Sequence, residues 1–181
     1  MPWQTNSSHV VYENAWIRVR HDEVARPDGS DGVYGVVESR NPAVFIVAID
    51  EDDRVHLVRL DRYTTGEQWE VPAGGTDGED PLTAAQRELR EETGHVARDW
   101  QRLGELWALN GVCRARHHVF LARDLHPAEG HEGNQQDEEG ISQTRWVPWA
   151  DVLRMLREGE IQDGETVSAL MLAALALDRV S

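Results

Sequence analysis

Three glutamates, Glu88, Glu91 and Glu92, lie close together in a segment whose composition is typical of a helix. Spacings of three and four residues bring their carboxylates onto one helix face, where like charges repel one another. A divalent cation with hard oxygen ligands, such as Mg²⁺, would compensate this charge and would also bind the phosphates of a substrate. The three residues therefore indicate metal-assisted chemistry on a phosphate compound.

A glycine-rich stretch, residues 73–78, comes shortly before these glutamates. Glycine lets the backbone approach a ligand closely, and exposed main-chain groups beside carboxylates suit a metal-bridged phosphate. The alternative is that Arg87 pairs with Glu91 and that the acidic face is simply solvated. The glycines favour the metal site.

The helix expected to carry the glutamates has clear ends. Asp80 is a good N-cap, Pro81 suits the first helical position, and Gly94 can adopt the left-handed conformation that ends a helix. An apolar stripe that can face a core runs beside the carboxylates. It consists of Leu82, Ala85 and Leu89.

Residues 79–94 resemble the Nudix box, the signature of the Nudix hydrolase family. The box has a glutamate, seven residues, Arg-Glu, an aliphatic residue, any residue, Glu-Glu, any residue and Gly, and the chain matches these positions in register. In two places the chain differs: the loop between Gly74 and Glu79 is one residue shorter, and His95 takes an aliphatic position. So many charged positions at fixed spacing make the resemblance highly specific.

This resemblance implies an α/β fold, namely a Nudix-type α/β/α sandwich with a mixed sheet. It also implies hydrolysis of a pyrophosphate bond with Mg²⁺, for which Mn²⁺ could substitute. Pairing of Arg87 with Glu79 would hold the loop against the helix. The metal ligands that the resemblance implies are Glu88, Glu91, Glu92 and the backbone carbonyl of Ala73.

Over nearly the whole chain, the residues around the box resemble the ADP-ribose pyrophosphatase branch of the family. The matching segments are 62–63, 69–74 and 159–166, whereas Asn110 replaces a proline that marks the branch. ADP-ribose or a nucleotide sugar is then the leading substrate. We expect Arg62 to anchor it, because a guanidinium matches phosphate geometry, with a surface ion pair as the alternative role. Glu70 and Gly74 are the other expected substrate-binding residues.

The general base has three candidates. In the ADP-ribose branch it is a glutamate on a loop before a late strand, a place that Glu138 and Glu139 occupy, and Glu139 is preferred. The alternative is that this acidic run only solvates the loop. In some Nudix enzymes the base comes from the box, which makes Glu91 the third candidate.

Two other functions are compatible with the motif. One is a nucleoside triphosphate pyrophosphohydrolase that sanitises nucleotide pools, and the other is a non-catalytic Nudix-fold module that binds or senses nucleotides. The intact pairs Arg87-Glu88 and Glu91-Glu92 argue against the non-catalytic module.

Composition narrows the class of protein further. The formal net charge of −15 argues against nucleic-acid binding, because no basic stripe is present to displace counterions. A single cysteine, Cys113, excludes an internal disulfide, and no signal peptide or membrane-spanning run is visible. We expect a cytoplasmic protein without membrane partners, whose ligand is a small nucleoside diphosphate derivative.

The remaining patterns predict alternating strands and helices in two parts, residues 1–40 and a Nudix domain of residues 41–181. The first part should form an antiparallel hairpin, and the branch resemblance implies a homodimer that uses this region, residues 10–38. The expected strands are 10–20, 33–38, 43–49, 54–60, 68–71, 100–108, 116–123 and 145–147. Further helices are expected at 151–157 and 166–177, and a polar loop at 127–140.

Overall fold

The computed structural model of the chain describes residues 1–129 and 140–180. The chain divides into two compact units, which we call the first and the second unit. The first comprises Met1–Pro42 and Leu106–His117, and the second comprises Ala43–Glu105 and His118–Ser181. The sequence-based division after residue 40 stays a prediction, and it does not include the segment Leu106–His117 that joins the first unit.

The first unit is built on three antiparallel strands, β1 (Gln4–Glu13), β2 (Ile17–Ala25) and β3 (Asp31–Ser39). The prediction of one strand over residues 10–20, and hence of a two-stranded hairpin, is wrong. A turn interrupts that segment, because the side-chain oxygen of Asn14 accepts hydrogen bonds from the N–H groups of Trp16 and Ile17, both at 2.9 Å.

The strands that lie wholly or mainly in the second unit form two groups. In one, β4 (Ala43–Ala48) lies between β9 (Cys113–Pro127) and β7 (Ala73–Gly75), and β8 (His95–Ala108) also pairs with β9. In the other, β5 (Arg54–Arg62) lies between β10 (Ile141–Pro148) and β6 (Gly66–Glu70). The first residues of the predicted glycine loop are therefore a strand, since Val44 pairs with Gly74 and Phe45 with Ala73.

Most strand pairs are antiparallel, but β3 pairs in parallel with the beginning of β9, where Val37 faces Cys113. The sheet is therefore mixed, as predicted.

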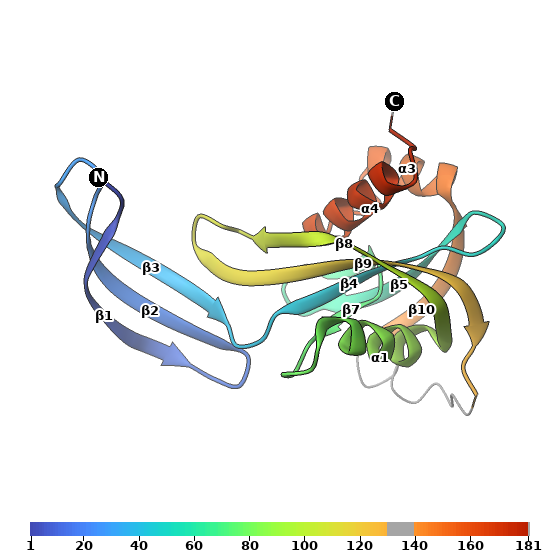
Figure 1. The fold of residues 1–181 in the computed structure, drawn as a ribbon, viewed down its shortest axis with the longest axis horizontal. Coiled ribbons are helices and arrows are strands. Elements are labelled where there is room, and N and C mark those ends of the chain that lie inside the picture. The colour runs from blue at the N-terminus through green and yellow to red at the C-terminus, as the bar shows by residue number, and fades with distance from the viewer. Residues whose placement is uncertain (130–139, 181) are drawn as a thin grey trace. The chain divides into compact units, whose positions relative to one another are not determined.

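Helices cover both sides of the second unit. Figure 1 shows α1 (Pro81–Thr93) on one side of β4 and α4 (Gly164–Ala176) on the other, and α3 (Trp149–Glu158) lies on the side of α4. This arrangement confirms the predicted α/β/α sandwich. None of the described helices is long and apolar enough to cross a membrane.

The core between α1 and β4 follows the sequence pattern. Val44, Ile46 and Ala48 alternate along β4 and pack against fully buried Ala85 and Leu89 of the helix. The helix ends as predicted: Asp80 accepts from the N–H of Leu82 at 3.0 Å, and Gly94 has a φ of 70° and donates to Arg90. Burial of the apolar stripe fixes the rotation of α1 about its axis, and with it the direction of the glutamates.

Candidate active site

Two of the three box glutamates are buried and converge on the start of β7. Glu88 is 4 % exposed and Glu92 is 2 % exposed. The carboxylate of Glu92 accepts a hydrogen bond from the N–H of Ala73 at 2.9 Å. A Cβ atom added to Gly74 would lie 2.1 Å from Oε1 of Glu88, so only glycine leaves room for this carboxylate. Both carboxylates therefore lie against the backbone of residues 73–74.

Arg87 connects the glutamates to the loop before the helix. Its Nε donates to Glu79 at 3.0 Å, and its Nη2 donates to the carbonyl of Gly75 at 2.8 Å. Nη1 donates to Glu88 at 2.7 Å and to Glu91 at 3.0 Å. Both pairings suggested by the sequence, Arg87 with Glu79 and Arg87 with Glu91, are thus present, and one guanidinium compensates several carboxylates.

The environment of Arg87 favours its protonated, positively charged form. Partial burial alone would lower its pKa, but the hydrogen bond that Arg87 donates to Glu79, with the contributions of Glu88 and Glu91, outweighs burial and raises the pKa above its ordinary value. Arg87 therefore stays a cation at every pH at which the protein is folded, and it reduces the repulsion between the glutamates.

Arg62 and Glu70, the two expected substrate-binding side chains, form a bidentate ion pair. Nε and Nη2 of Arg62 donate to the two carboxylate oxygens of Glu70 at 3.0 and 2.6 Å. The bond to Glu70 raises the pKa of Arg62, and the negative charges of Glu92 and Asp163 add to the effect. Glu70 is buried, whereas the side chain of Arg62 is 46 % exposed, so Glu70 holds a half-exposed guanidinium close to the box glutamates.

Sequence reasoning missed Thr166, a fully buried residue of α4. Its hydroxyl accepts a hydrogen bond from the N–H of Val71 at 3.2 Å, while its own N–H donates to the helix cap Asp163 at 2.7 Å. Thr166 of α4 thus holds the segment just before β7, and Glu92 of α1 holds the first residue of β7. Thr166 lies in a segment that resembles the ADP-ribose branch, but no local pattern pairs it with Val71.

The residue types beside β7 fit a hard divalent cation. The buried carboxylates of Glu88 and Glu92 both approach the backbone of residues 73–74. The carboxylate of Glu88 can lie there only because Gly74 has no side chain. Within residues 1–129 and 140–180, no group of three or more His, Cys, Asp or Glu side chains is arranged to hold a metal ion. Of the box glutamates, Glu88 and Glu91 are instead bonded to Arg87. The fit therefore rests on Glu88, Glu92 and backbone oxygen. Two of the candidate bases, Glu138 and Glu139, lie outside the described residues.

Comparisons with known proteins agree with this geometry. Residues 39–170 match the NUDIX domain, and residues 3–37 match the nucleoside diphosphate sugar hydrolase N-terminal domain. The chain belongs to the Nudix hydrolase family. It is similar to an ADP-ribose pyrophosphatase of Mycobacterium tuberculosis, with 34 % identity over 93 % of this chain and 82 % of that protein.

Two further relatives are hydrolases of ADP compounds. The ADP compounds hydrolase NudE of Escherichia coli is 35 % identical over 79 % of this chain and 77 % of its own. A crystal structure of an ADP compounds hydrolase superposes with a TM-score of 0.83 and 26 % identity, covering 98 % of this chain and 97 % of that one. The fold predicted from the box is therefore confirmed over almost the whole chain.

Proposed function

We propose that this protein hydrolyses the pyrophosphate bond of a nucleoside diphosphate linked to another group, with ADP-ribose or a nucleotide sugar as substrate. The observation that carries the proposal is the convergence of Glu88 and Glu92 on residues 73–74. The names of the relatives support the substrate class, since they describe an ADP-ribose pyrophosphatase and hydrolases of ADP compounds.

Glu88, Glu92 and the carbonyl of Ala73 would hold Mg²⁺ or Mn²⁺, and Glu91 would bind a second ion or a coordinated water. When bound, the metal neutralises the diphosphate oxygens and supplies a Lewis acid for attack by water. The approach of two buried carboxylates to the same stretch of backbone supports this role, because Mg²⁺ takes hard oxygen ligands from one or two carboxylates. Arg87 holds Glu79, Glu88 and Glu91 in place.

Arg62 would bind a substrate phosphate through its planar guanidinium. Glu70 uses both oxygens to fix the direction of that guanidinium. The attacking water needs a base within hydrogen-bond reach, and we propose Glu139, with Glu138 and Glu91 as the other candidates. Separate Gln variants at these three positions would identify the base by the loss of kcat at unchanged substrate affinity.

The direct test is incubation with Mg²⁺ and a panel of ADP-ribose, nucleotide sugars and nucleoside triphosphates, with the products identified by mass. Cleavage of the diphosphate compounds is the expected result. Release of pyrophosphate from triphosphates alone would instead identify a sanitising enzyme, and tight binding without turnover would identify a binding module.

We also propose a cytoplasmic homodimer that uses the first unit. The strand β1 supports this part, because all ten of its residues are exposed and its outer edge is unpaired among the described residues. Elution from a calibrated sizing column distinguishes a dimer from a monomer.

A further inference from the structure

Charge is distributed unevenly between the two units. The first unit contains six arginines and six carboxylates, so the net charge of −15 belongs entirely to the second unit. The chain contains no lysine, and all 18 of its strongly basic residues are arginines. The negative charge of the second unit repels a small anion, whereas the first unit carries no net charge. A local cluster of arginines in the first unit can therefore attract such an anion.

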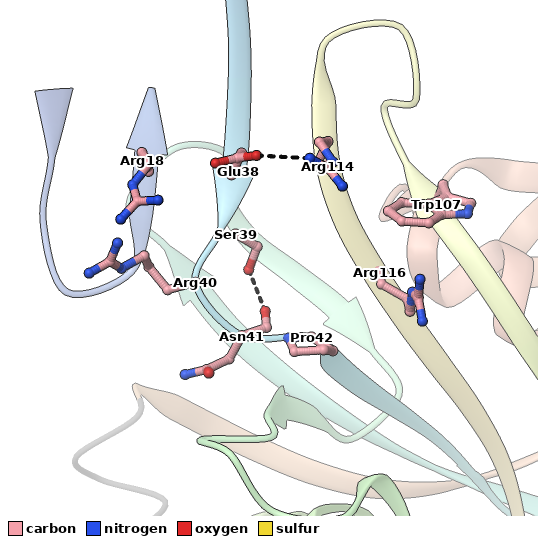
Figure 2. Close-up of a pocket in the computed structure, with 9 residues that line it drawn as sticks. All are labelled: Arg18, Glu38, Ser39, Arg40, Asn41, Pro42, Trp107, Arg114 and Arg116. Carbon is pink, nitrogen blue, oxygen red and sulfur yellow. Dashed lines mark hydrogen bonds and ion pairs between the residues drawn. The ribbon is translucent and has the colours of Figure 1, made fainter. Parts of the chain in front are cut away.

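Four of those six arginines line one cavity of about 390 Å³ within the first unit. Figure 2 shows Arg18 and Arg40 on one side of it and Arg114 and Arg116 on the opposite side, on β9. Glu38 is the one carboxylate among the lining residues. Positive charge therefore exceeds negative charge in the wall of the cavity.

Two carboxylates near the cavity, Glu38 and Glu13, each contact two arginines. One oxygen of Glu38 accepts from both Arg20 at 2.7 Å and Arg114 at 3.2 Å. One oxygen of Glu13 likewise contacts both Arg18 at 3.3 Å and Arg40 at 3.4 Å. Each carboxylate is thus shared by two guanidiniums. The pairs of Glu13 are also long and half-exposed, and such pairs give up their partners at little cost.

An aromatic surface completes the cavity. The guanidinium carbon of Arg116 lies 4.9 Å from the ring centroid of Trp107, and Trp107 is 51 % exposed. Guanidinium groups match phosphate oxygens in a planar fork, and an exposed indole offers a face on which a base can stack. Arginines and an exposed tryptophan in one cavity can therefore contact the phosphate and the base of one nucleotide.

We propose that this cavity binds a phosphate-bearing anion, with Arg114 and Arg116 on the phosphate and Trp107 on the base of a nucleotide. The site uses none of the α1 glutamates. The proposal therefore does not depend on the hydrolytic function, and each can fail without the other.

The test measures binding of three probes, orthophosphate, ribose 5-phosphate and AMP, to the full chain by calorimetry in EDTA and low salt. EDTA removes divalent ions and so suppresses phosphate binding at the α1 glutamates. We expect saturable binding that the double variant R114Q/R116Q weakens at least about tenfold, because each lost charge-assisted hydrogen bond contributes to affinity. The matched control R123Q/R154Q removes two arginines from ion pairs of the second unit and should bind as the wild type does.

Trp107→Ala separates the possible sources of the phosphate. If the cavity binds a nucleotide, this variant should lose affinity for AMP and keep its affinity for orthophosphate. Equal affinities for all three probes, in the wild type and in the variant, would instead support a site for phosphate alone and would overturn the role of Trp107. Circular dichroism and thermal unfolding confirm that each variant is folded. No saturable binding of any probe up to about 10 mM, or unchanged binding by R114Q/R116Q, would overturn the proposal.

Discussion

The carboxylate of Glu92 accepts a hydrogen bond from the backbone N–H of Ala73 at 2.9 Å and so joins helix α1 to the start of β7. Along the chain, a loop and most of helix α1 lie between the two residues. Their contact puts a buried negative charge beside the backbone that would supply a metal ligand. The electrostatics of the candidate site depend on this arrangement.

Replacing Glu92 by Gln should weaken metal binding without loosening the site. The amide oxygen of Gln can still accept from Ala73, but it brings no charge, and the loss of one charged ligand should reduce Mn²⁺ affinity by roughly 100-fold. Titration followed by the EPR signal of free Mn²⁺ measures this without any turnover. The control Glu158→Gln changes an exposed carboxylate of α3 that pairs with Arg154. Equal Mn²⁺ affinities in all three proteins would exclude Glu92 as a ligand.

Arg87→Ala should lower stability and make it depend more strongly on magnesium. The substitution removes bonds to Glu79, Glu88 and Glu91, and we expect a loss of about 2 kcal/mol, less than for a fully buried pair because Arg87 is partly exposed. Added Mg²⁺ should then raise the melting temperature more than in the wild type, because it relieves the exposed repulsion between carboxylates.

The matched control for this experiment is Arg90→Ala, which removes the next arginine of α1. Arg90 is exposed and, among the described residues, donates a long bond of 3.4 Å to the carbonyl of Glu129. An identical magnesium-induced shift in the wild type, Arg87→Ala and Arg90→Ala would contradict the compensating role of Arg87.

Gly74→Ala should displace the carboxylate of Glu88. The new Cβ would lie 2.1 Å from Oε1, and overpacking of this kind costs about 1–3 kcal/mol of unfolding free energy. Hydrolytic activity should fall with it. Gly75→Ala is the control, since the nearest atom to its Cβ would be Oδ1 of the exposed side chain of Asp77 at 3.3 Å, which can move aside. The prediction fails if both variants unfold at the same denaturant concentration.

Thr166→Val should uncouple α4 from the segment before β7. Valine has nearly the same shape but leaves the buried N–H of Val71 without its acceptor, at a cost of about 1–3 kcal/mol. Thr166→Ser keeps the hydroxyl and should recover most of that stability. If Val and Ser variants were equally stable in urea, the hydrogen bond to Val71 would not be the reason for a threonine at this position.

Acid should destabilise the protein through His56, whose ring stacks on Trp146 with the centroids 4.2 Å apart. Burial, with a smaller effect of His95, lowers the pKa of His56 from 6.5 to about 3. Between these values the unfolded chain binds a proton that the folded chain does not. This contribution to stability is therefore complete above about pH 6.5 and is lost as the pH falls toward 3, by at most about 1.4 kcal/mol per pH unit.

His56→Phe keeps the stacked ring and removes the titrating group. Urea unfolding from about pH 7 to about pH 4 should therefore show a shallower loss of stability in the variant than in the wild type. Parallel curves would assign the acid sensitivity to other groups.

Where the sequence predicts the structure well, the signals are local. The ends of α1 follow from Asp80, Pro81 and Gly94, each of which acts on its own neighbours. The turn at Asn14 was missed because a single asparagine side chain makes it inside a run of strand-forming residues. Residues 73–75 are glycine-rich yet form a strand, since pairing with β4 overrides their weak propensity.

Some contacts of the candidate site likewise follow from local sequence patterns, whereas others do not. Helical spacing brings Glu88, Glu91 and Glu92 together, and the box pattern pairs Arg87 with Glu79. The bond from Val71 to Thr166 joins residues 95 positions apart, and the arginine cavity collects side chains from β2, β9 and the segment after β3. Such contacts depend on tertiary packing, which no local pattern contains.

The most direct measurement is the rate of ADP-ribose cleavage by the wild type and by Glu92→Gln, with Mg²⁺ and with EDTA, and with the products identified by mass. We expect AMP and ribose 5-phosphate from the wild type with Mg²⁺ alone, and a rate roughly 1000-fold lower in the folded variant, because the metal contributes several kcal/mol to the transition state. Undiminished cleavage by Glu92→Gln, or cleavage that persists in EDTA, would contradict metal-assisted hydrolysis at Glu92.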